Sequence, residues 1–329
     1  MYILGIETSC DETAASVSCN GSILSNVVAT QIVHSPYGGV VPELASRMHE
    51  RSIVSVTHQA IHQANIQKND ITAISFTQGP GLLGSLLVGT CFAKGFAQAL
   101  HIPLIAVDHM KAHIFAHYID APAPEYPFLC LTVSGGHTQI VLVNSFTDIK
   151  VIGKTLDDAV GEAFDKAAKI MDIPYPGGPL IDKYAQSGDK NRYRFPIAHI
   201  PDYDYSFSGV KTALLYFLRD NTATNADFIK NNIHDICASY QHTLIQTLLL
   251  KLKKASKDLG INRIAIAGGV AANSYLRAQL LICANEHWEI FIPKLEYCTD
   301  NAAMIAHTGY MMYLNNQFAD LKTVAKAVM

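Results

Sequence analysis

The sequence predicts an α/β protein with two similar lobes that face each other across a cleft. Short apolar runs that end in small or polar residues recur three times, at 2–16, 128–143 and 261–276. Helical patterns lie between these runs, and the length of 329 residues is about twice the ~150 residues of a typical single domain. Mixed strands and helices that repeat in two halves are typical of layered α/β units.

The apolar runs predict strands, because each is short and leads into a turn of small residues. Strands over 3–6 and 129–133 enter Gly/Ser turns that could open hairpins, whereas the strand over 263–267 leads to a helix that starts at Asn273. Helical patterns occur at 43–66, 85–100, 157–171, 208–219 and 227–259. Gly- and Pro-rich stretches predict loops at 36–42, 78–84 and 174–179, and the segment 187–209 predicts a long irregular connection.

Charge and cysteine content narrow the class of protein. The formal net charge of −3 argues against binding nucleic acid through the overall field, so an RNA contact would need a local basic patch or a partner protein. The seven cysteines are scattered and never spaced C-x-x-C, which argues against a disulfide framework and fits a reducing cytosol. The first residues are acidic where a secretory signal is basic, and "TQGPG" interrupts the uncharged run at 71–93. We therefore expect a cytoplasmic protein without a membrane span.

Three histidines recur every four residues in "VDHMKAHIFAHY". On a helix, residues four apart lie one above the other, so His109 and His113 can bind one ion, whereas His117 lies about 80° around from His109. His58 and His62 share this spacing, but they lie in mid-helix among polar residues and are interpreted as a solvated face. The first pair instead follows a predicted buried strand, a common location of sites in α/β folds.

The peptidase motif is incomplete at this histidine pair. The motif H-E-x-x-H needs Glu directly after the first His as the general base, and Met110 occupies that place. A metal held by His109 and His113 would instead take a carboxylate from elsewhere in the chain as its third ligand. Two imidazoles and one carboxylate suit Fe(II) or Zn(II). A metallopeptidase is kept as an alternative hypothesis.

Three turns of small residues favour a nucleotide site. Gly135-Gly136 and Gly268-Gly269 leave room for backbone N–H groups to approach phosphate oxygens, although a tight hairpin or a helix cap is the simpler explanation of each turn alone. The first turn carries three carboxylates, those of Glu7, Asp11 and Glu12. Carboxylates repel phosphate unless a cation intervenes, so a metal in the same cleft would reconcile these features. A non-catalytic ATP-binding scaffold of the actin and sugar-kinase class is the other alternative function.

Two further charged groups are candidates for weaker roles. The helix at 157–171 is predicted to carry a solvated acidic face formed by Asp158, Glu162 and Asp165. Two pairs of arginines flank an aromatic ring and are candidates for RNA contacts; they are Arg192 and Arg194 around Tyr193, and Arg47 and Arg51 around His49.

Ten segments, in order, resemble the TsaD family of tRNA N6-adenosine threonylcarbamoyltransferases, once described as glycoprotein endopeptidases. They are "GIETSCDET" (5–13), "YGGVVPELASR" (37–47), "GPGLLGSLLVG" (79–89), "HMKAH" (109–113), "VSGGHTQ" (133–139), "GEAFDKAAK" (161–169), "YPGGP" (175–179), "YSFSGVKT" (205–212), "AGGVAAN" (267–273) and "CTDNAAMIA" (298–306). They span nearly the whole chain. His137 resembles the bacterial branch of the family.

The resemblance implies a fold and a division of the chain. It implies two RNase-H-like lobes of the actin-like ATPase (ASKHA) superfamily, with a nucleotide and metal cleft between them. The N-terminal lobe is expected over 1–127, joined by C-terminal helices within 301–329, and the C-terminal lobe over 128–300.

The resemblance also implies an activity. The threonylcarbamoyl group of L-threonylcarbamoyl-AMP would pass to N6 of adenosine 37, just 3′ of the anticodon, in tRNAs reading codons that begin with A, with release of AMP. His109, His113 and Asp300 would bind one divalent ion, iron in preference to zinc, and Asp11 or Glu12 is a candidate for accepting the amine proton. Residues implied to contact the adenylate are Thr132, Val133, Ser134, Gly135, Gly136, Asp165, Gly178, Asp182 and Asn273. The implied protein partners are a TsaB-like shorter paralogue and a TsaE-like ATPase.

Overall fold

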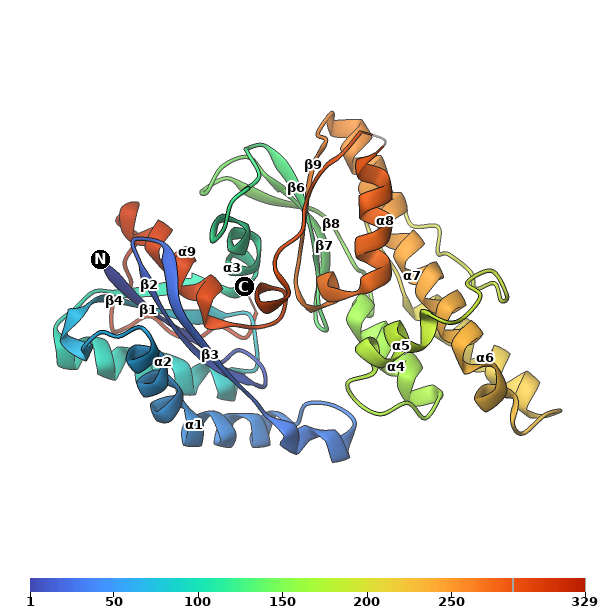
Figure 1. The fold of residues 1–329 in the computed structure, drawn as a ribbon, viewed down its shortest axis with the longest axis horizontal. Coiled ribbons are helices and arrows are strands. Elements are labelled where there is room, and N and C mark those ends of the chain that lie inside the picture. Colours follow the sequence, from blue (N-terminus) through green and yellow to red (C-terminus); the bar gives the residue numbers. More distant parts are fainter. Residues whose placement is uncertain (286, 329) are drawn as a thin grey trace. The chain divides into compact units, whose positions relative to one another are not determined.

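The structure, a computed structural model, describes residues 1–285 and 287–328, which form two compact units (Figure 1). The first unit contains Met1–Ala123 and Lys294–Met329, and the second contains Pro124–Pro293. The sequence-based division instead placed its boundaries after residues 127 and 300. The chain re-enters the first unit at Lys294, before the expected boundary at residue 300. Lys294 pairs with Asp120 at 2.8 Å, and Tyr297 packs in the core of the first unit.

The first unit contains a five-stranded sheet with the order β3-β2-β1-β4-β5. Strand β1 (Tyr2–Glu7) forms an antiparallel hairpin with β2 (Glu12–Cys19), which pairs with β3 (Ser22–Thr30). Strands β4 (Ile71–Gly79) and β5 (Leu104–Asp108) extend the sheet parallel to β1. The hairpin predicted after 3–6 is confirmed, and the carboxyl ends of β1, β4 and β5 meet at one edge.

Helices cover both faces of this sheet. Alternate residues of a strand point to opposite faces, and in β1 Leu4 packs with α1 (Pro42–Gln63) and α2 (Leu83–Leu100) while Ile3 packs with α3 (His109–Phe115) and α9 (Ala302–Leu314). The predicted helices at 43–66 and 85–100 are thus confirmed with shifted ends. Among the described residues, α2 alone is long and apolar enough to cross a membrane, and it packs against α1 and β4. Between residues 301 and 328 the only α-helix that the structure describes is α9, whereas several helices were expected there.

The second unit repeats the arrangement of the first sheet. Its strand order is β10-β9-β6-β7-β8. Strand β6 (Phe128–Val133) forms the predicted hairpin with β7 (Thr138–Val143), followed by β8 (Ile149–Lys154), and β9 (Arg263–Ala267) and β10 (Glu289–Phe291) run parallel to β6. The same order and directions in both sheets confirm the prediction of two similar α/β lobes.

The helices of the second unit carry most of the remaining sequence. They are α4 (Val160–Ile170), α5 (Gly177–Ala185), α6 (Ser208–Thr222), the long α7 (Phe228–Leu259) and α8 (Ser274–Ala284). The predicted helix start at Asn273 is confirmed, because its side chain accepts a hydrogen bond from Leu276 N at 2.9 Å. Part of the predicted loop at 174–179 is the first turn of α5.

The predicted solvated acidic face of α4 is wrong. Asp158 lies before the helix and pairs with Lys166 at 2.7 Å and with Lys211 at 2.9 Å. Glu162 also pairs with Lys166, and Asp165 accepts hydrogen bonds from the backbone at the start of α5. Asp158 and Asp165 therefore connect different elements, and Glu162 pairs within α4, so the three carboxylates do not form a face that contacts only water.

Candidate functional site

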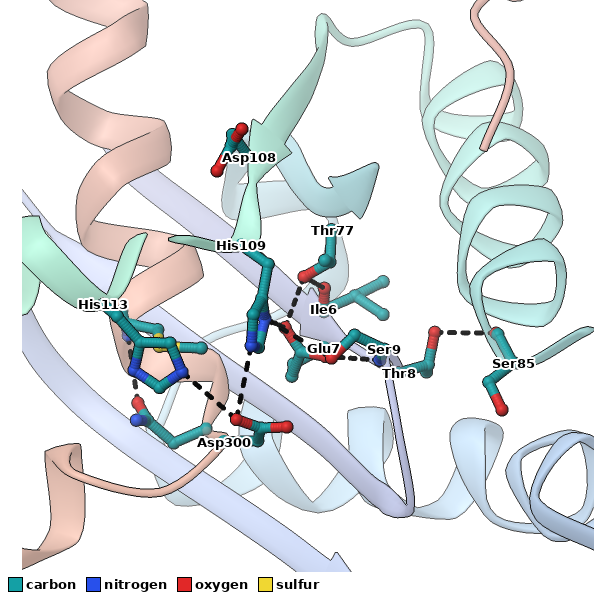
Figure 2. Close-up of polar contacts among 12 residues, drawn as sticks. Ile6, Glu7, Thr8, Ser9, Thr77, Ser85, Asp108, His109, His113 and Asp300 are labelled. Carbon is teal, nitrogen blue, oxygen red and sulfur yellow. Dashed lines mark hydrogen bonds and ion pairs between the residues drawn. The ribbon is translucent and has the colours of Figure 1, made fainter. Parts of the chain in front are cut away.

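The predicted metal ligands meet at the carboxyl edge of the first sheet, where sites of α/β proteins commonly lie (Figure 2). His109 is the first residue of α3, and His113 lies one turn later. The side chain of Asp108 starts this helix by accepting a hydrogen bond from Lys111 N at 2.9 Å. Asp300 lies just before α9.

A close contact between β1 and α9 supports the position of Asp300. A Cβ atom at Gly5 would lie 2.5 Å from the backbone nitrogen of Ala306 and 2.6 Å from the carbonyl oxygen of Ala302. Only glycine allows this approach, which brings the start of α9 against the strand that ends at Glu7.

The three ligand groups have the spacing of a metal site. The Nε2 atoms of His109 and His113 lie 3.3 and 3.2 Å from Asp300 Oδ1, and the three ligand atoms all lie within 4.8 Å of one another. Ligands held ~2.1 Å from one tetrahedral or octahedral ion lie roughly 3.0–3.4 Å apart. Both imidazoles are buried, and their rings meet edge to face at 88°. The donor set therefore fits an iron or zinc ion.

Glu7 lies behind His109, at the end of β1. Its Oε2 is 3.0 Å from His109 Nδ1 and accepts a hydrogen bond from Thr77 Oγ1 at 2.5 Å, while Ser9 N donates to its other oxygen (Figure 2). Glu7 is fully buried. A carboxylate on the second nitrogen of a ligand imidazole fixes the tautomer that leaves the first nitrogen free for the metal. Sequence reasoning placed Glu7 only among the acidic residues of the first turn and missed this contact.

The pKa shifts show that the site favours positive charge. Burial raises the pKa of Asp300, but His109 and His113 outweigh it and hold that pKa well below the usual value. Burial likewise raises the pKa of Glu7, and its interactions with His109 bring the net shift downward. Burial lowers the pKa of His109, yet Asp300 and Glu7 raise it well above normal. The ionised carboxylates of Asp300 and Glu7 thus favour the protonated, positively charged form of His109, and the same negative charges would favour a divalent cation.

The other histidines behave as the sequence predicted. His117 lies in the short 3₁₀ turn Ala116–Tyr118 and is not part of the ligand group that the described residues form. His58 and His62 are exposed on α1.

Of the candidates for proton transfer, Asp11 lies in the turn between β1 and β2, and Glu12 is the first residue of β2. Burial, followed by the negative charges of Asp300 and Asp11, raises the pKa of Glu12 to about 9. This turn is therefore electrostatically coupled to the metal ligands.

The residues expected to contact the adenylate lie in the second unit, starting from the turn after β6. Ser134 O accepts a hydrogen bond from Gly161 N at 3.2 Å, so the turn lies against the start of α4. Gly135 and Gly136 have open space beside their Cα atoms. Gly268 has a φ of +89°, and a Cβ there would lie 2.4 Å from Val133 O, so this position requires glycine. The turn thus offers exposed backbone next to a helix N-terminus.

Two further contacts link this turn to the starts of α5 and α8. Asp165 Oδ1, on α4, accepts hydrogen bonds from Gly177 N at 2.9 Å and Gly178 N at 3.2 Å, and burial raises its pKa. Asp182, on α5, accepts from Ser274 N at 2.9 Å and from Ser274 Oγ at 2.8 Å.

Asn273 and Thr132 complete this set. Asn273 donates to Gln241 Oε1 at 2.9 Å, and the Thr132 hydroxyl is buried without a hydrogen-bond partner in the described part of the chain. Predicted residues therefore connect the starts of α4, α5 and α8, and carboxylates already accept hydrogen bonds from the backbone at the starts of α5 and α8.

Comparison with known proteins identifies a family. The family model described as "TsaD: tRNA N6-adenosine threonylcarbamoyltransferase" matches residues 22–307. A protein of that name from Cytophaga hutchinsonii is 59% identical over 318 residues, covering 96% of this chain and 93% of the relative. Another, from Christiangramia forsetii, is 57% identical over 329 residues, covering 99% and 97%.

Solved structures of low sequence identity share the fold. Full-length HypF superposes with a TM-score of 0.61 at 13% identity, covering 95% of this chain and 46% of HypF. The ROK hexokinase from Thermus thermophilus superposes with a TM-score of 0.51 at 16% identity, covering 96% and 100%. This chain therefore shares its two-lobed α/β fold with HypF and the ROK hexokinase.

Proposed function

Because the chain belongs to the TsaD family of tRNA N6-adenosine threonylcarbamoyltransferases, we propose that it passes the threonylcarbamoyl group of L-threonylcarbamoyl-AMP to N6 of adenosine 37 in tRNA. The substrates are tRNAs that read codons beginning with A, and the products are N6-threonylcarbamoyladenosine and AMP. The observation that carries this proposal is the family match together with the meeting of His109, His113 and Asp300.

The two alternative functions lack support in the chain. A zinc peptidase needs a free carboxylate as the base for a metal-bound water. Glu7, the buried carboxylate beside His109, is bonded to Thr77 and Ser9 instead. The two relatives named above are called transferases, and this chain aligns with nearly their whole length. This disfavours both the peptidase and the non-catalytic scaffold.

His109, His113 and Asp300 would hold one divalent ion, and we propose Fe(II) as the native metal with Zn(II) as the alternative. Such an ion supplies Lewis-acid stabilisation of the negative charge that grows on the departing AMP. Around it, Glu7 keeps the proton of His109 on Nδ1, so that Nε2 faces the ligand position. Metal analysis of anaerobically purified protein distinguishes iron from zinc.

The second unit would bind the adenylate. Thr132 and Val133 end β6, Ser134 follows them, and the open turn at Gly135 and Gly136 would offer backbone N–H groups to the phosphate beside the start of α4. The other predicted contacts, Asp165, Gly178, Asp182 and Asn273, fix the starts of α5 and α8 in the same set. The mixed anhydride is already activated, so placing the adenine amine against its carbonyl is the main task left to the protein.

We assign proton acceptance from the N6 amine to Asp11 or Glu12. Asp11 lies in the turn after β1 and Glu12 starts β2, and the raised pKa of Glu12 makes its deprotonated carboxylate a stronger base than an ordinary one. Because Asp300 is one cause of this raised pKa, a cation held at Asp300 would lower it toward neutrality.

We further propose that the protein works in the cytoplasm with a TsaB-like paralogue and a TsaE-like ATPase. Support for a reducing compartment comes from the thiols of Cys10, Cys19, Cys91, Cys130, Cys237 and Cys283, which form no disulfide among the described residues. Co-purification of the three proteins, with reconstitution of activity from the separate components, tests the partnership.

The activity is tested with purified protein, its partners, L-threonylcarbamoyl-AMP and unmodified tRNA. Mass spectrometry of the nucleosides measures the product. We expect the double variant His109→Ala, His113→Ala to lose at least about 100-fold in rate. The matched control is His58→Ala, His62→Ala, which removes two exposed histidines of the same spacing and should retain activity. Absence of product from the wild type, or equal activity in both double variants, would refute the proposal.

A further inference from the structure

The irregular connection before α6 contains a segment that is held firmly against α7. Asp189 N donates to Asp235 Oδ1 at 2.8 Å, and Asp189 O accepts from Ser239 Oγ at 3.2 Å. Ser239 Oγ also accepts a hydrogen bond from Tyr193 N at 3.1 Å. Gly188 lies so close to α7 that a Cβ would be 2.1 Å from His234 O. The path of this segment is therefore fixed by backbone contacts.

Aromatic side chains of the same segment pack against rings on α6 and α7. The centre of the Tyr193 ring lies 4.9 Å from that of Phe217. The centre of the Phe195 ring lies 5.7 Å from those of Phe217 and Tyr240. The Tyr193 hydroxyl donates to Asn232 Oδ1 at 3.0 Å. Ordering a loop costs conformational entropy, and here ring contacts of the half-buried Tyr193 and Phe195, together with hydrogen bonds, offset that cost.

Three cations on this segment face solvent: Lys190, Arg192 and Arg194, here termed the cationic ridge. No ion pair of Arg192 or Arg194 occurs among the described residues, whereas the exposed Arg47 and Arg219 each pair with a carboxylate. Two acids on this segment and on the facing part of α7 are engaged by backbone groups, because Asp189 accepts from Asn191 N at 2.9 Å and Asp235 from Asp189 N at 2.8 Å. The structure thus holds two arginines in place without giving them an anion.

The ridge begins beside the residues assigned to the adenylate. Lys190 Nζ lies 3.4 Å from the hydroxyl of Tyr275 and 5.5 Å from the centre of its ring. The Tyr275 hydroxyl is 2.8 Å from His242 Nδ1, and Tyr275 follows Ser274, which Asp182 holds. One contact therefore connects the ridge to the start of α8.

We propose that the cationic ridge binds the phosphate backbone of the tRNA substrate next to the adenylate-contact residues. This inference rests on the proposed function, and the chemistry agrees with it. A chain with a net charge of −3 needs a local cationic surface to hold RNA, and the forked guanidinium of arginine matches phosphate. The partly exposed ring of Tyr275 adds a surface on which a base can stack.

The test compares two triple variants of the full chain, assayed with its partners. The ridge variant is Lys190→Gln, Arg192→Gln, Arg194→Gln. The control, Lys150→Gln, Lys154→Gln, Lys169→Gln, removes three exposed charges from the same unit. We expect the ridge variant to raise the KM for tRNA roughly tenfold and to lower the slope of log affinity against log salt by about 2, since each phosphate contact contributes roughly 0.7–0.9. Its affinity for the adenylate should equal that of the wild type.

The outcomes separate this proposal from the proposed function. A ridge variant with the wild-type KM and salt slope overturns the ridge, and so does a control variant that loses as much tRNA affinity. A wild type that binds tRNA through the ridge but forms no modified nucleoside refutes the transferase and leaves the ridge supported.

Discussion

At the scale of single residues, the contact between Glu7 and His109 governs the metal site. His109 uses one ring nitrogen toward Asp300 and the other toward Glu7, so its orientation depends on both carboxylates. Thr77 and Ser9 in turn orient Glu7. Glu7, which is not one of the three proposed ligands, therefore influences how well His109 can bind the ion.

We predict that Glu7→Gln weakens metal affinity about 10- to 100-fold, because partners of ligand histidines typically contribute that much. The amide keeps the size of the side chain but removes the charge that holds the proton on Nδ1. Competition with a coloured chelator measures the affinity without any assay of activity. Glu43→Gln, which changes an exposed carboxylate of the same unit, is the control and should leave the affinity unchanged. Equal affinities in all three proteins would contradict the role of Glu7.

The sequence predicted only part of this site from spacing. The helical period pairs His109 with His113 because both lie on one short helix. No local pattern connects His113 with Asp300, which is 187 positions away, so that ligand came from family resemblance alone. Glu7 was missed as a partner because strand pairing, which local sequence does not reveal, brings β1 and β5 to either side of β4.

At the scale of elements, Asp157 fastens the start of α6. Its Oδ1 accepts hydrogen bonds from Phe207 N at 2.8 Å and Ser208 N at 3.3 Å. Its Oδ2 accepts from the hydroxyls of Ser206 at 2.5 Å and Ser208 at 2.6 Å. One carboxylate thus performs for α6 the role of an N-cap, although it lies on a distant segment of the chain.

We predict that Asp157→Ala lowers the free energy of unfolding by about 1–2 kcal/mol near neutral pH, as the loss of a helix cap does. Partial burial raises the pKa of Asp157, but the serine hydroxyls and backbone N–H groups outweigh it and lower the pKa. A lowered folded-state pKa gives stability that is present above the unfolded value of about 4 and disappears as pH falls through the folded value. The difference between wild type and variant should therefore shrink below pH ~4, as urea titrations can measure. Asp220→Ala, at the other end of α6, is the control, and a pH-independent difference would contradict the prediction.

The element assignments show where local sequence was sufficient. The periodic patterns of α1, α2, α6 and α7 predicted those helices, with errors confined to their ends. The start of α4 was placed too early because Asp157 and Asp158 bind other segments instead of entering the helix. The glycines of α5 suggested a loop, but Asp165 holds their N–H groups in a helical turn. Tertiary hydrogen bonds decided both cases.

At the scale of the whole molecule, all three proposed metal ligands belong to the first unit. A ligand that binds only the folded state stabilises it by mass action. At a free metal concentration of about 100 times Kd, we predict that the melting temperature of the first unit rises by roughly 5–10 °C.

Calorimetry with and without a chelator measures this shift. The single tryptophan, Trp288, lies in the second unit, so its fluorescence reports unfolding there and should shift less. The control is the double variant His109→Ala, His113→Ala, which should show no shift. A shift that persists in that variant would place the stabilising ion elsewhere.

The late position of Asp300 has a consequence for biosynthesis. The second unit is synthesised in full between the two histidines and this aspartate. At ~5–20 residues per second, a ribosome needs roughly 10–40 s to travel from His113 to Asp300. During that time the histidines have emerged without their carboxylate partner, and α9 has not yet packed on β1. The ion can therefore bind to the complete set of three ligands only near the end of translation, after the second unit has had time to fold.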